Sequence, residues 1–243
     1  IVDDFFDQYF EARVRDCETS GENAVGRSGD APIAAIPTSA PTSDVAAVAA
    51  ENSDEEDLGC GLRIPKRLWQ KMYQYQRSAV RWLWALHQQA VGGILGDEMG
   101  LGKTLQVIAL LAGLHHSGIL QSGVIVVCPA TLIHHWVSEI HRWYPPLRVL
   151  VLHGSSRSVR KGATEKEIIV KALRSRGVLI TTYAGVRLKE NLQRAPWHYA
   201  VLDEGQRIKN HDSGAAMACK SLITPHRILM SGAPMQNNLK ELW

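Results

Sequence analysis

Short apolar runs alternate with helix-like patterns along most of the chain from about residue 61 onward. The apolar runs expected to be strands are 92–95, 124–128, 149–152, 178–182, 199–203 and 227–231. Helical spacing is found between them, in residues 105–114, 132–143 and 165–175. Strands that alternate with helices predict an α/β domain, with a parallel sheet covered by helices on both faces. Ligands of such sheets bind at the carboxyl ends of the strands.

The first 60 residues differ from the rest in composition and in hydrophobic pattern. Residues 1–16 place their aromatic side chains near one face of a short amphipathic helix. Residues 17–57 are rich in small, polar and acidic residues and contain no large aromatic residue. Such a segment buries too little apolar area to offset the entropy of ordering. We therefore expect residues 1–60 to be acidic and mostly disordered, and residues 61–243 to form one domain. The acidic start without an initiator methionine indicates an excerpt of a longer chain rather than a signal peptide.

Charge is divided unevenly between these two parts. Residues 1–60 contain 14 acidic and 3 basic residues, whereas residues 61–243 contain 10 acidic and 24 basic residues. A basic domain beside an acidic tail indicates a polyanionic partner, although a solvated surface without a partner explains the charge equally well. No apolar run approaches the roughly 20 residues that a membrane span needs, so we expect no membrane partner.

Cysteine, histidine and tryptophan add little to this picture. The four cysteines are far apart, which argues against a zinc or disulfide framework and favours a reducing compartment. The adjacent histidine pairs, at 115–116 and 134–135, lack metal-ligand spacing. Four tryptophans at helical spacings are expected to be core or packing residues rather than platforms for bases: Trp82, Trp84, Trp136 and Trp143.

A glycine-rich loop is the most informative local feature. It lies between an expected strand and an expected helix, and reads Asp97-Glu98-Met99-Gly100-Leu101-Gly102-Lys103-Thr104. This context is typical of a phosphate-binding loop, in which glycines let backbone N–H groups turn toward an anion. Lys103 would add positive charge, Thr104 would offer a hydroxyl to Mg²⁺, and the helix would direct its positive end at the phosphates. Asp97 stands where the strict pattern has glycine, so a glycine turn that merely caps a helix is the alternative.

An acidic pair follows another expected strand. Asp203 would hold the magnesium ion opposite Thr104, and Glu204 would orient and deprotonate the attacking water. The alternative is a strand-ending turn whose acids cap a helix. Because both the pair and the glycine loop lie at strand ends, we expect them to meet at one edge of the sheet.

Six motifs occur in an order that resembles a known family. They are Tyr75-Gln76, the loop at 97–104, the segments 126–131 and 180–183, Asp203-Glu204-Gly205-Gln206, and the stretch 231–243. Over roughly residues 62–243 the chain resembles the first ATPase lobe of SWI/SNF-type DNA translocases, a branch of helicase superfamily two. The resemblance implies a RecA-like lobe with ATP, Mg²⁺ and double-stranded DNA as ligands, and a second ATPase lobe in the full-length chain. Segments such as Trp197-His198-Tyr199 are most similar to the Cockayne syndrome group B type, which implies a nuclear repair or remodelling factor with RNA polymerase or nucleosomes as partners.

The same resemblance assigns roles to single residues. Gln76 would read the adenine edge. ATP would be bound by the loop residues Asp97, Glu98, Met99, Gly100, Leu101, Gly102, Lys103 and Thr104. The catalytic residues would be Lys103 and Glu204. Pro129, Ala130, Thr131, Thr181 and Thr182 would contact the DNA backbone, and Lys209 is a further candidate that fits a solvated loop equally well. Gln206, Ser231 and Gly232 would couple the ATP and DNA sites. Two residues depart from the family pattern: Gln206 replaces a usual histidine, and Ala233 a common threonine.

The sequence therefore predicts the ATP-binding lobe of an ATP-dependent double-stranded DNA translocase. The isolated lobe is expected to be nearly inactive, because arginines supplied by a second lobe are worth about 10³–10⁵ in rate in related nucleotide hydrolases. A general chromatin remodeller of the same branch and a non-catalytic, ATP-gated DNA-binding scaffold remain as alternatives. An RNA helicase is disfavoured, because the loop and the 231–234 motif of RNA helicases usually have other residues than those found here.

Overall fold

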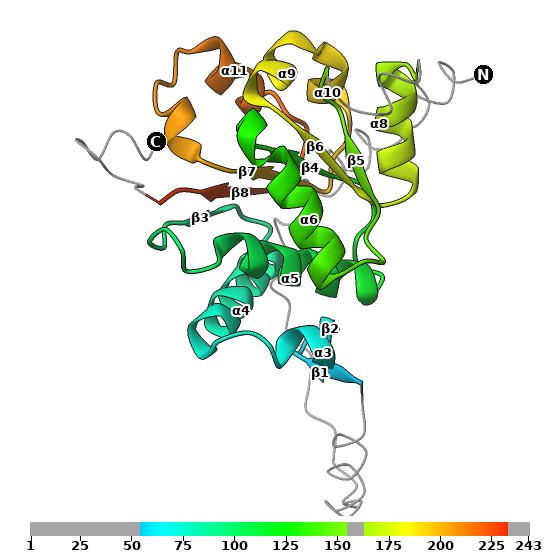
Figure 1. Cartoon of the computed structure of the whole chain (residues 1–243), viewed down its shortest axis with the longest axis vertical. Helices are drawn as coiled ribbons and strands as arrows, with labels where there is room; N and C mark the ends of the chain where they lie inside the picture. The colour runs from blue at the N-terminus through cyan, green and yellow to red at the C-terminus, as the bar shows by residue number, and fades with distance from the viewer. Residues whose placement is uncertain (1–53, 155–162, 233–243) are drawn as a thin grey trace, which may run out of the picture.

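A single parallel sheet organises the part of the chain that the computed structural model describes, residues 54–154 and 163–232 (Figure 1). Its six strands follow the order β3-β8-β7-β4-β6-β5, and every neighbouring pair is parallel. The strands are β3 (Gly93–Leu95), β4 (Val124–Val127), β5 (Val149–Val151), β6 (Val178–Thr181), β7 (Tyr199–Leu202) and β8 (His226–Met230). The parallel α/β sheet expected from the alternation of strands and helices is confirmed.

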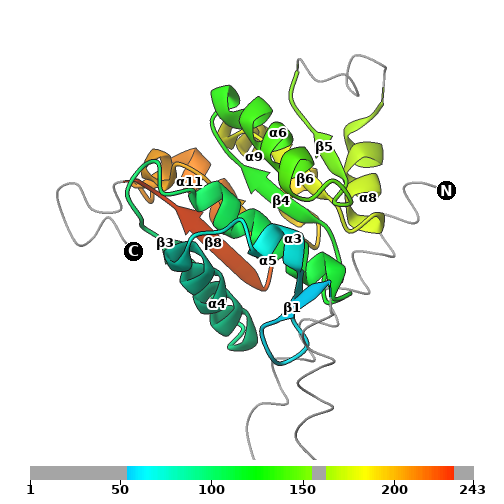
Figure 2. The ribbon, with the colours of Figure 1, turned by 60° about the horizontal axis from the view of Figure 1, so that its bottom comes forward.

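Helices cover both faces of this sheet, as Figure 2 shows. They are α3 (Lys66–Trp69), α4 (Gln74–Gln88), α5 (Lys103–His116), α6 (Ile133–Trp143), α8 (Glu165–Arg174), α9 (Tyr183–Leu188), α10 (Glu190–Arg194) and α11 (Gly214–Lys220). Two short 3₁₀ turns, η1 (Ala130–Leu132) and η2 (Gly205–Ile208), follow β4 and β7. Helices α4, α5 and α6 pack on one face, whereas α8 to α11 pack on the other.

The central strands show why the sequence forms this sandwich. All four residues of β4, of β6 and of β7 are buried, which is typical of parallel strands covered on both faces. Successive side chains of a strand point to opposite faces. Accordingly, Val124 and Val126 of β4 join the core beneath α5, while Ile125 and Val127 join the core beneath α8 and α9.

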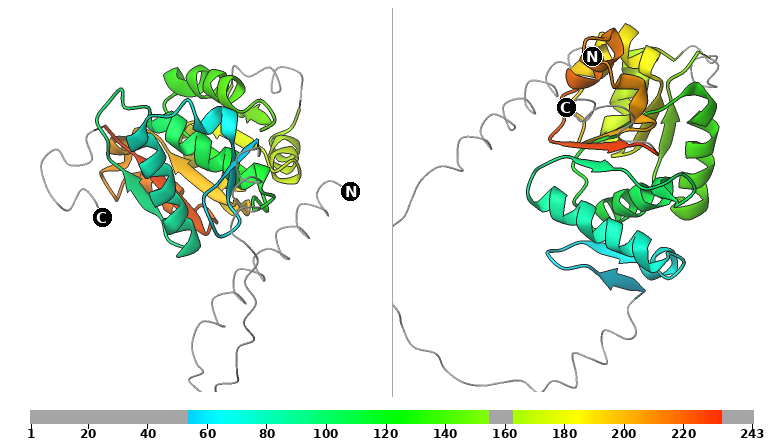
Figure 3. Two further views of the ribbon diagram at one scale, coloured as in Figure 1. Left: turned by 90° about the horizontal axis from the view of Figure 1, so that it is seen from below. Right: turned by 90° about the vertical axis from the view of Figure 1, so that its left-hand side faces the viewer.

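A hairpin at the start of the described chain was not expected. Strand β1 (Glu55–Asp57) pairs antiparallel with β2 (Arg63–Pro65), so three residues assigned to the disordered segment form a strand. The physical reason lies after the acidic run, where Leu62 and Ile64 are completely buried. Both pack on α5, where a Cβ added to Gly113 would come within 2.8 Å of Ile64. Figure 3 shows the hairpin, in blue and cyan, next to the helices of this face.

Two sequence expectations fall outside the described residues: the helix at 1–16 with the acidic segment up to 53, and the motif residues from 233 to 243. Among the helices that the structure describes, none is long and apolar enough to cross a membrane.

Candidate functional site

The glycine loop connects β3 to α5 at the carboxyl edge of the sheet. Gly100 and Gly102 adopt φ angles of 87° and 75°, a left-handed conformation that glycine tolerates far better than other residues. Gly102 has a second constraint, because a Cβ there would lie 2.5 Å from Nε2 of Gln76. The backbone therefore bends just before the first turn of α5, whose free N–H groups and dipole favour an anion.

Lys103 is the first residue of α5, and its side chain folds back over the loop. Its Nζ donates to the carbonyl oxygens of Asp97, at 2.7 Å, and of Glu98, at 2.9 Å. Thr104 follows it in the first helical turn and is half-buried. The ammonium group thus lies at the mouth of the loop, held by acceptors that phosphate oxygens can replace.

Asp97, which departs from the strict glycine pattern, has a structural partner. The fully buried Gln106 of α5 donates from Nε2 to Oδ2 of Asp97 at 3.1 Å. The carboxylate therefore ties the start of the loop to the helix that follows it. Sequence reasoning missed Gln106, although its polar side chain inside an apolar helix was a visible signal.

Gln76 links α4 to the same loop. Its Oε1 accepts a hydrogen bond from the backbone N–H of Tyr73 at 2.9 Å, which caps α4, and its Nε2 donates to the carbonyl of Leu101 at 3.1 Å. The side chain is 5% exposed. Its place beside Gly102 is established, whereas the reading of an adenine edge stays a prediction.

Asp203 follows β7, and its carboxylate is held by two hydrogen-bond donors. Its Oδ2 accepts from the indole Nε1 of Trp136 at 2.8 Å, and its Oδ1 accepts from the backbone N–H of Glu204 at 2.9 Å. Burial raises the pKa of Asp203, and the two hydrogen bonds oppose this shift. The negative charge of Glu204 adds to the rise, and the positive charge of Lys103 reduces it. Lys103 follows β3 and Asp203 follows β7, so the ammonium and the carboxylate come from two strand ends that are separated only by β8, although they are distant in sequence.

Glu204 occupies a strained position in this site. Its φ of 55° and ψ of 54° are left-handed, which is unusual for a non-glycine residue and typical of functional turns. Its carboxylate accepts a hydrogen bond from Nε2 of Gln206, whose Oε1 accepts one from the hydroxyl of Ser231 at 3.0 Å. Gln206 can bridge the two because an amide both donates and accepts.

Comparison with known proteins identifies the family. The SNF2-related domain matches residues 75–243, about 70% of the chain. The chain belongs to the SNF2-related family. It is 48% identical to the DNA excision repair protein ERCC-6 of Mus musculus over 206 residues, which cover 79% of this chain and 14% of that protein. It is 39% identical to the DNA repair and recombination protein RAD26 of Saccharomyces cerevisiae, covering 79% of this chain and 22% of that protein.

Solved structures agree with this assignment. The SWI2/SNF2 ATPase core of Sulfolobus solfataricus in complex with double-stranded DNA superposes with a TM-score of 0.61 at 29% sequence identity. The match covers 71% of this chain and 34% of that structure. The expected resemblance to a RecA-like SWI/SNF lobe of the Cockayne syndrome group B type is confirmed. The chain spans less than a quarter of the length of the repair proteins that it resembles.

In this SNF2-related domain, the segment after β8 lies against the glycine loop. The backbone N–H of Ser231 donates to the carbonyl of Leu95, the last residue of β3, at 3.2 Å. A Cβ added to Gly232 would come within 2.5 Å of Cγ of Met99, so glycine permits the close approach. The structure therefore brings together the loop, the acidic pair and the residues expected to couple them.

The residues expected to contact DNA lie farther along the same carboxyl edge. Thr131 in η1 and Lys209 after η2 are exposed. Thr182 is half-buried at the start of α9, where its hydroxyl accepts a hydrogen bond from the N–H of Gly185 at 3.0 Å. Pro129 is buried beneath η1.

Thr181 corrects the expectation for this edge. It is completely buried, and its hydroxyl donates to the carbonyl of Leu152 at 3.0 Å, so its side chain does not reach the surface. Thr182 is less buried because it lies beyond the end of β6, at the N-cap of α9.

The tryptophans only partly follow expectation. Trp136 is fully buried and Trp84 is nearly so, whereas Trp82 is 42% exposed. The hydrogen bond from Trp136 to Asp203 was not foreseen, since the spacing of an aromatic residue in a helix carries no information about its partners in a distant strand end.

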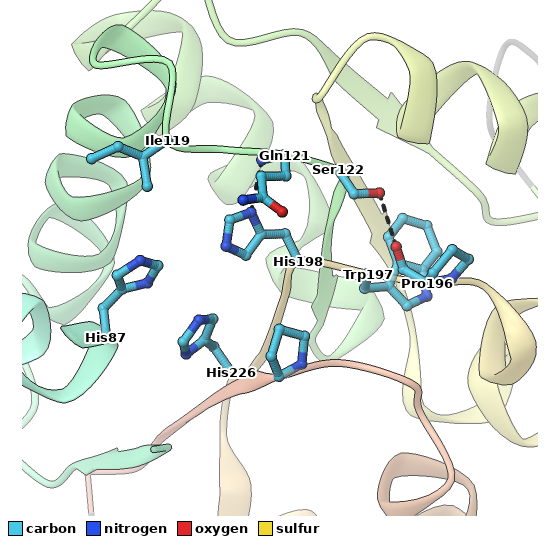
Figure 4. A pocket seen from close by; sticks show the side chains of 9 residues that line it. His87, Ile119, Gln121, Ser122, Pro196, Trp197, His198 and His226 are labelled. Atoms are coloured by element: carbon cyan, nitrogen blue, oxygen red, sulfur yellow. Dashed lines mark hydrogen bonds between the residues drawn. The ribbon is translucent and has the colours of Figure 1, made fainter. Parts of the chain in front are cut away.

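A separate cavity lies at the opposite, amino-terminal ends of β7 and β8 (Figure 4). It has a volume of about 230 Å³, and His87, His198 and His226 approach one another there with ring nitrogens within 4.8 Å. The rings of His87 and His226 are stacked, with centroids 4.3 Å apart and planes at 26°. Nδ1 of His198 accepts from the backbone N–H of Gln121 at 2.8 Å, which places the ring proton on Nε2. Stacked planes and a protonated Nε2 fit a neutral aromatic cluster better than a set of metal ligands.

Proposed function

We propose that this domain is the ATP-binding lobe of a DNA-dependent ATPase that moves along double-stranded DNA. The observation that carries the proposal is that the glycine loop with Lys103 and the turn with Asp203 and Glu204 both lie at the carboxyl edge of the sheet, with only β8 between their strands. Ser231, which follows β8, is hydrogen-bonded to both sides. Membership of the SNF2-related family supports nucleotide binding.

The residues present fit a magnesium–nucleotide complex. Gly100 and Gly102 bend the loop so that backbone N–H groups can surround phosphates, and the Lys103 ammonium can exchange its loop carbonyls for phosphate oxygens. The Asp203 carboxylate and the Thr104 hydroxyl are oxygen ligands of the kind that Mg²⁺ prefers. A bound Mg²⁺ would neutralise the charge that develops on the phosphates.

Glu204 is the proposed general base. Its carboxylate is aimed by the amide of Gln206, which is itself bound by Ser231. A base within this hydrogen-bonded row can accept a proton from water in the site. Ser231 also contacts Leu95 at the end of β3, where the loop begins. A displacement of the loop would therefore also displace Gln206 and Glu204, and the reverse.

The DNA part of the proposal rests on three residues at the carboxyl edge: the exposed Thr131 and Lys209 and the half-buried Thr182. The similar Sulfolobus solfataricus core is described in complex with double-stranded DNA, which supports duplex DNA as the ligand. Contacts to phosphates carry no sequence code, so binding should be independent of sequence and weakened by salt.

The whole protein is proposed to act in transcription-coupled repair in the nucleus, with a second ATPase lobe and with RNA polymerase or nucleosomes as partners. The names of ERCC-6 and RAD26 support repair. A general remodeller is the second candidate, favoured by 43% identity to the Arabidopsis thaliana protein CHROMATIN REMODELING 8. An ATP-gated scaffold without catalysis is the third, and the intact acidic pair argues against it.

Two substitutions test the enzyme. Lys103→Ala should abolish ATP binding by this chain, whereas Lys171→Ala, at an exposed lysine on α8, should leave it unchanged.

In the full-length protein, Glu204→Gln should retain ATP binding but lose DNA-stimulated hydrolysis. Equal hydrolysis by wild type and Glu204→Gln would favour the scaffold, and stronger stimulation by RNA than by duplex DNA would contradict the DNA assignment.

A further inference from the structure

Trp136 is the only side-chain donor to the Asp203 carboxylate among the hydrogen bonds of the described residues. It lies in the first turns of α6, is completely buried, and donates from Nε1 to Oδ2 at 2.8 Å. An indole N–H can only donate. The bond therefore exists only while that carboxylate oxygen acts as an acceptor, the state that also binds a metal ion.

The carboxylate plane is fixed by this contact. Within the described residues, its other oxygen is bound only by the backbone N–H of the adjacent Glu204. The Asp203 backbone is anchored separately, because its carbonyl accepts from the hydroxyl of Tyr183 at 2.6 Å and its N–H donates to the carbonyl of Val127 at 2.9 Å. With the main chain held, removing the indole N–H leaves the N–H of Glu204 as the remaining hydrogen bond that orients the carboxylate.

The same helix leads directly to the exposed edge. Helix α6 begins immediately after η1, which carries the exposed Ala130 and Thr131. The two elements are joined by a hydrogen bond from the backbone N–H of Ile133, the first residue of α6, to the carbonyl of Ala130 in η1. A displacement of η1 by a bound phosphate backbone would therefore move Trp136 along with it.

We infer that Trp136 is a positioning residue that orients the Asp203 carboxylate for the metal and conveys DNA occupancy at η1 to it. This inference rests on the proposed function, since it needs a metal–nucleotide complex at Asp203 and DNA at η1. A purely structural role is the competing explanation, because any large buried side chain supports the core.

Trp143→Phe provides a matched control. Trp143 lies on the same helix, and its Nε1 donates to Oε2 of Glu139 within that helix, at 2.8 Å. Both Trp136→Phe and Trp143→Phe remove one indole N–H and one ring, but only the first loses a bond to the acidic pair.

The first measurement is the binding of a fluorescent ATP analogue by the chain, titrated with Mg²⁺ and repeated in EDTA. In Trp136→Phe the Mg²⁺ concentration needed for half-maximal binding should rise roughly ten- to hundredfold, the usual effect of losing a hydrogen bond to a charged group. Binding in EDTA should not change, and Trp143→Phe should match wild type in both. An unchanged Mg²⁺ titration in folded Trp136→Phe, or an equal shift in Trp143→Phe, would overturn the inference.

A second measurement needs no substitution. In ¹⁵N-tryptophan-labelled wild-type chain, the indole N–H signal of Trp136 should shift when Mg²⁺ and nucleotide are added, and again with duplex DNA, whereas that of Trp143 should stay. A Trp136 signal that is insensitive to either ligand, while other signals report binding, overturns the inference alone. Absence of any Mg²⁺-dependent nucleotide binding in wild type would instead refute the proposed function together with it.

Discussion

At the scale of single residues, the chemical groups of the candidate site can be recognised in the sequence, whereas the contacts that hold them can be seen only in the folded chain. The glycine loop, Lys103 and the acidic pair are contiguous signals, and a strand-and-helix context is enough to place them at one edge. Partners such as Gln106 and Trp136 lie on other elements, so only the folded chain shows what they touch. The left-handed conformation of Glu204 was equally invisible, because nothing in a glutamate predicts it.

Gly102→Ala is predicted to lower stability more than the conformational strain alone requires. A non-glycine residue at positive φ costs about 1–2 kcal/mol, and here the added Cβ would also meet Nε2 of Gln76 at 2.5 Å. Gly118→Ala isolates the strain, since its φ is 72° and no atom lies within 4 Å of the added Cβ. Urea denaturation should show a larger loss for Gly102→Ala than for Gly118→Ala. Equal losses would mean that the loop moves away from Gln76 at no cost.

At the scale of elements, the sequence predicted each strand of the main sheet to within a residue or two of its observed ends. Continuous apolar runs made this possible, because parallel strands buried on both faces have that signature. Helix α5 was placed as well, although it extends beyond its apolar part to Lys103 and His116. The hairpin of β1 and β2 was missed because its first strand is acidic and its stability comes from the two apolar residues of the second strand that pack on α5.

Ile64→Ala tests that explanation of the hairpin. The side chain of Ile64 is completely buried, so its truncation should lower the free energy of unfolding by about 2–5 kcal/mol. Arg63→Ala is the control from the same strand, because its ion pair with Glu55 is largely exposed and worth at most about 1 kcal/mol. A loss from Ile64→Ala no greater than that from Arg63→Ala would show that the hairpin is not part of the folded core.

At the scale of the whole molecule, the two ends of the sheet differ in chemistry. The carboxyl ends hold charged groups and left-handed turns, whereas the amino ends of β7 and β8 hold the cluster of His87, His198 and His226. These histidines are far apart in the sequence and follow no ligand spacing, so no local pattern predicts that they meet. Their proximity depends on strand order, and a single sequence does not reveal strand order.

Acid should destabilise the domain through this cluster. Burial lowers the pKa of His226 from 6.5 to about 4, and burial also lowers the pKa of His87. The unfolded chain therefore binds protons more readily, so stability is full above pH 6.5 and falls as the pH drops from 6.5 toward 4. For His226 the loss at pH 5 is about 2 kcal/mol.

The measurement is the free energy of unfolding at pH 7.5 and at pH 5. His226→Phe keeps a ring in the stack but cannot be protonated, so its stability should change less between the two pH values than that of wild type. His211→Phe is the control, because His211 is exposed. A wild-type pH dependence that His226→Phe leaves intact would assign acid sensitivity to other groups.

The position of β8 gives the site a mechanical property. This strand lies between β3, which leads into the glycine loop, and β7, which leads into the acidic pair. Its end at Ser231 and Gly232 contacts both neighbours. The chain thus leaves the sheet between the glycine loop on one side and the acidic pair on the other. A shift of Ser231 would therefore disturb the end of β3 and the pair of Gln206 and Glu204 together.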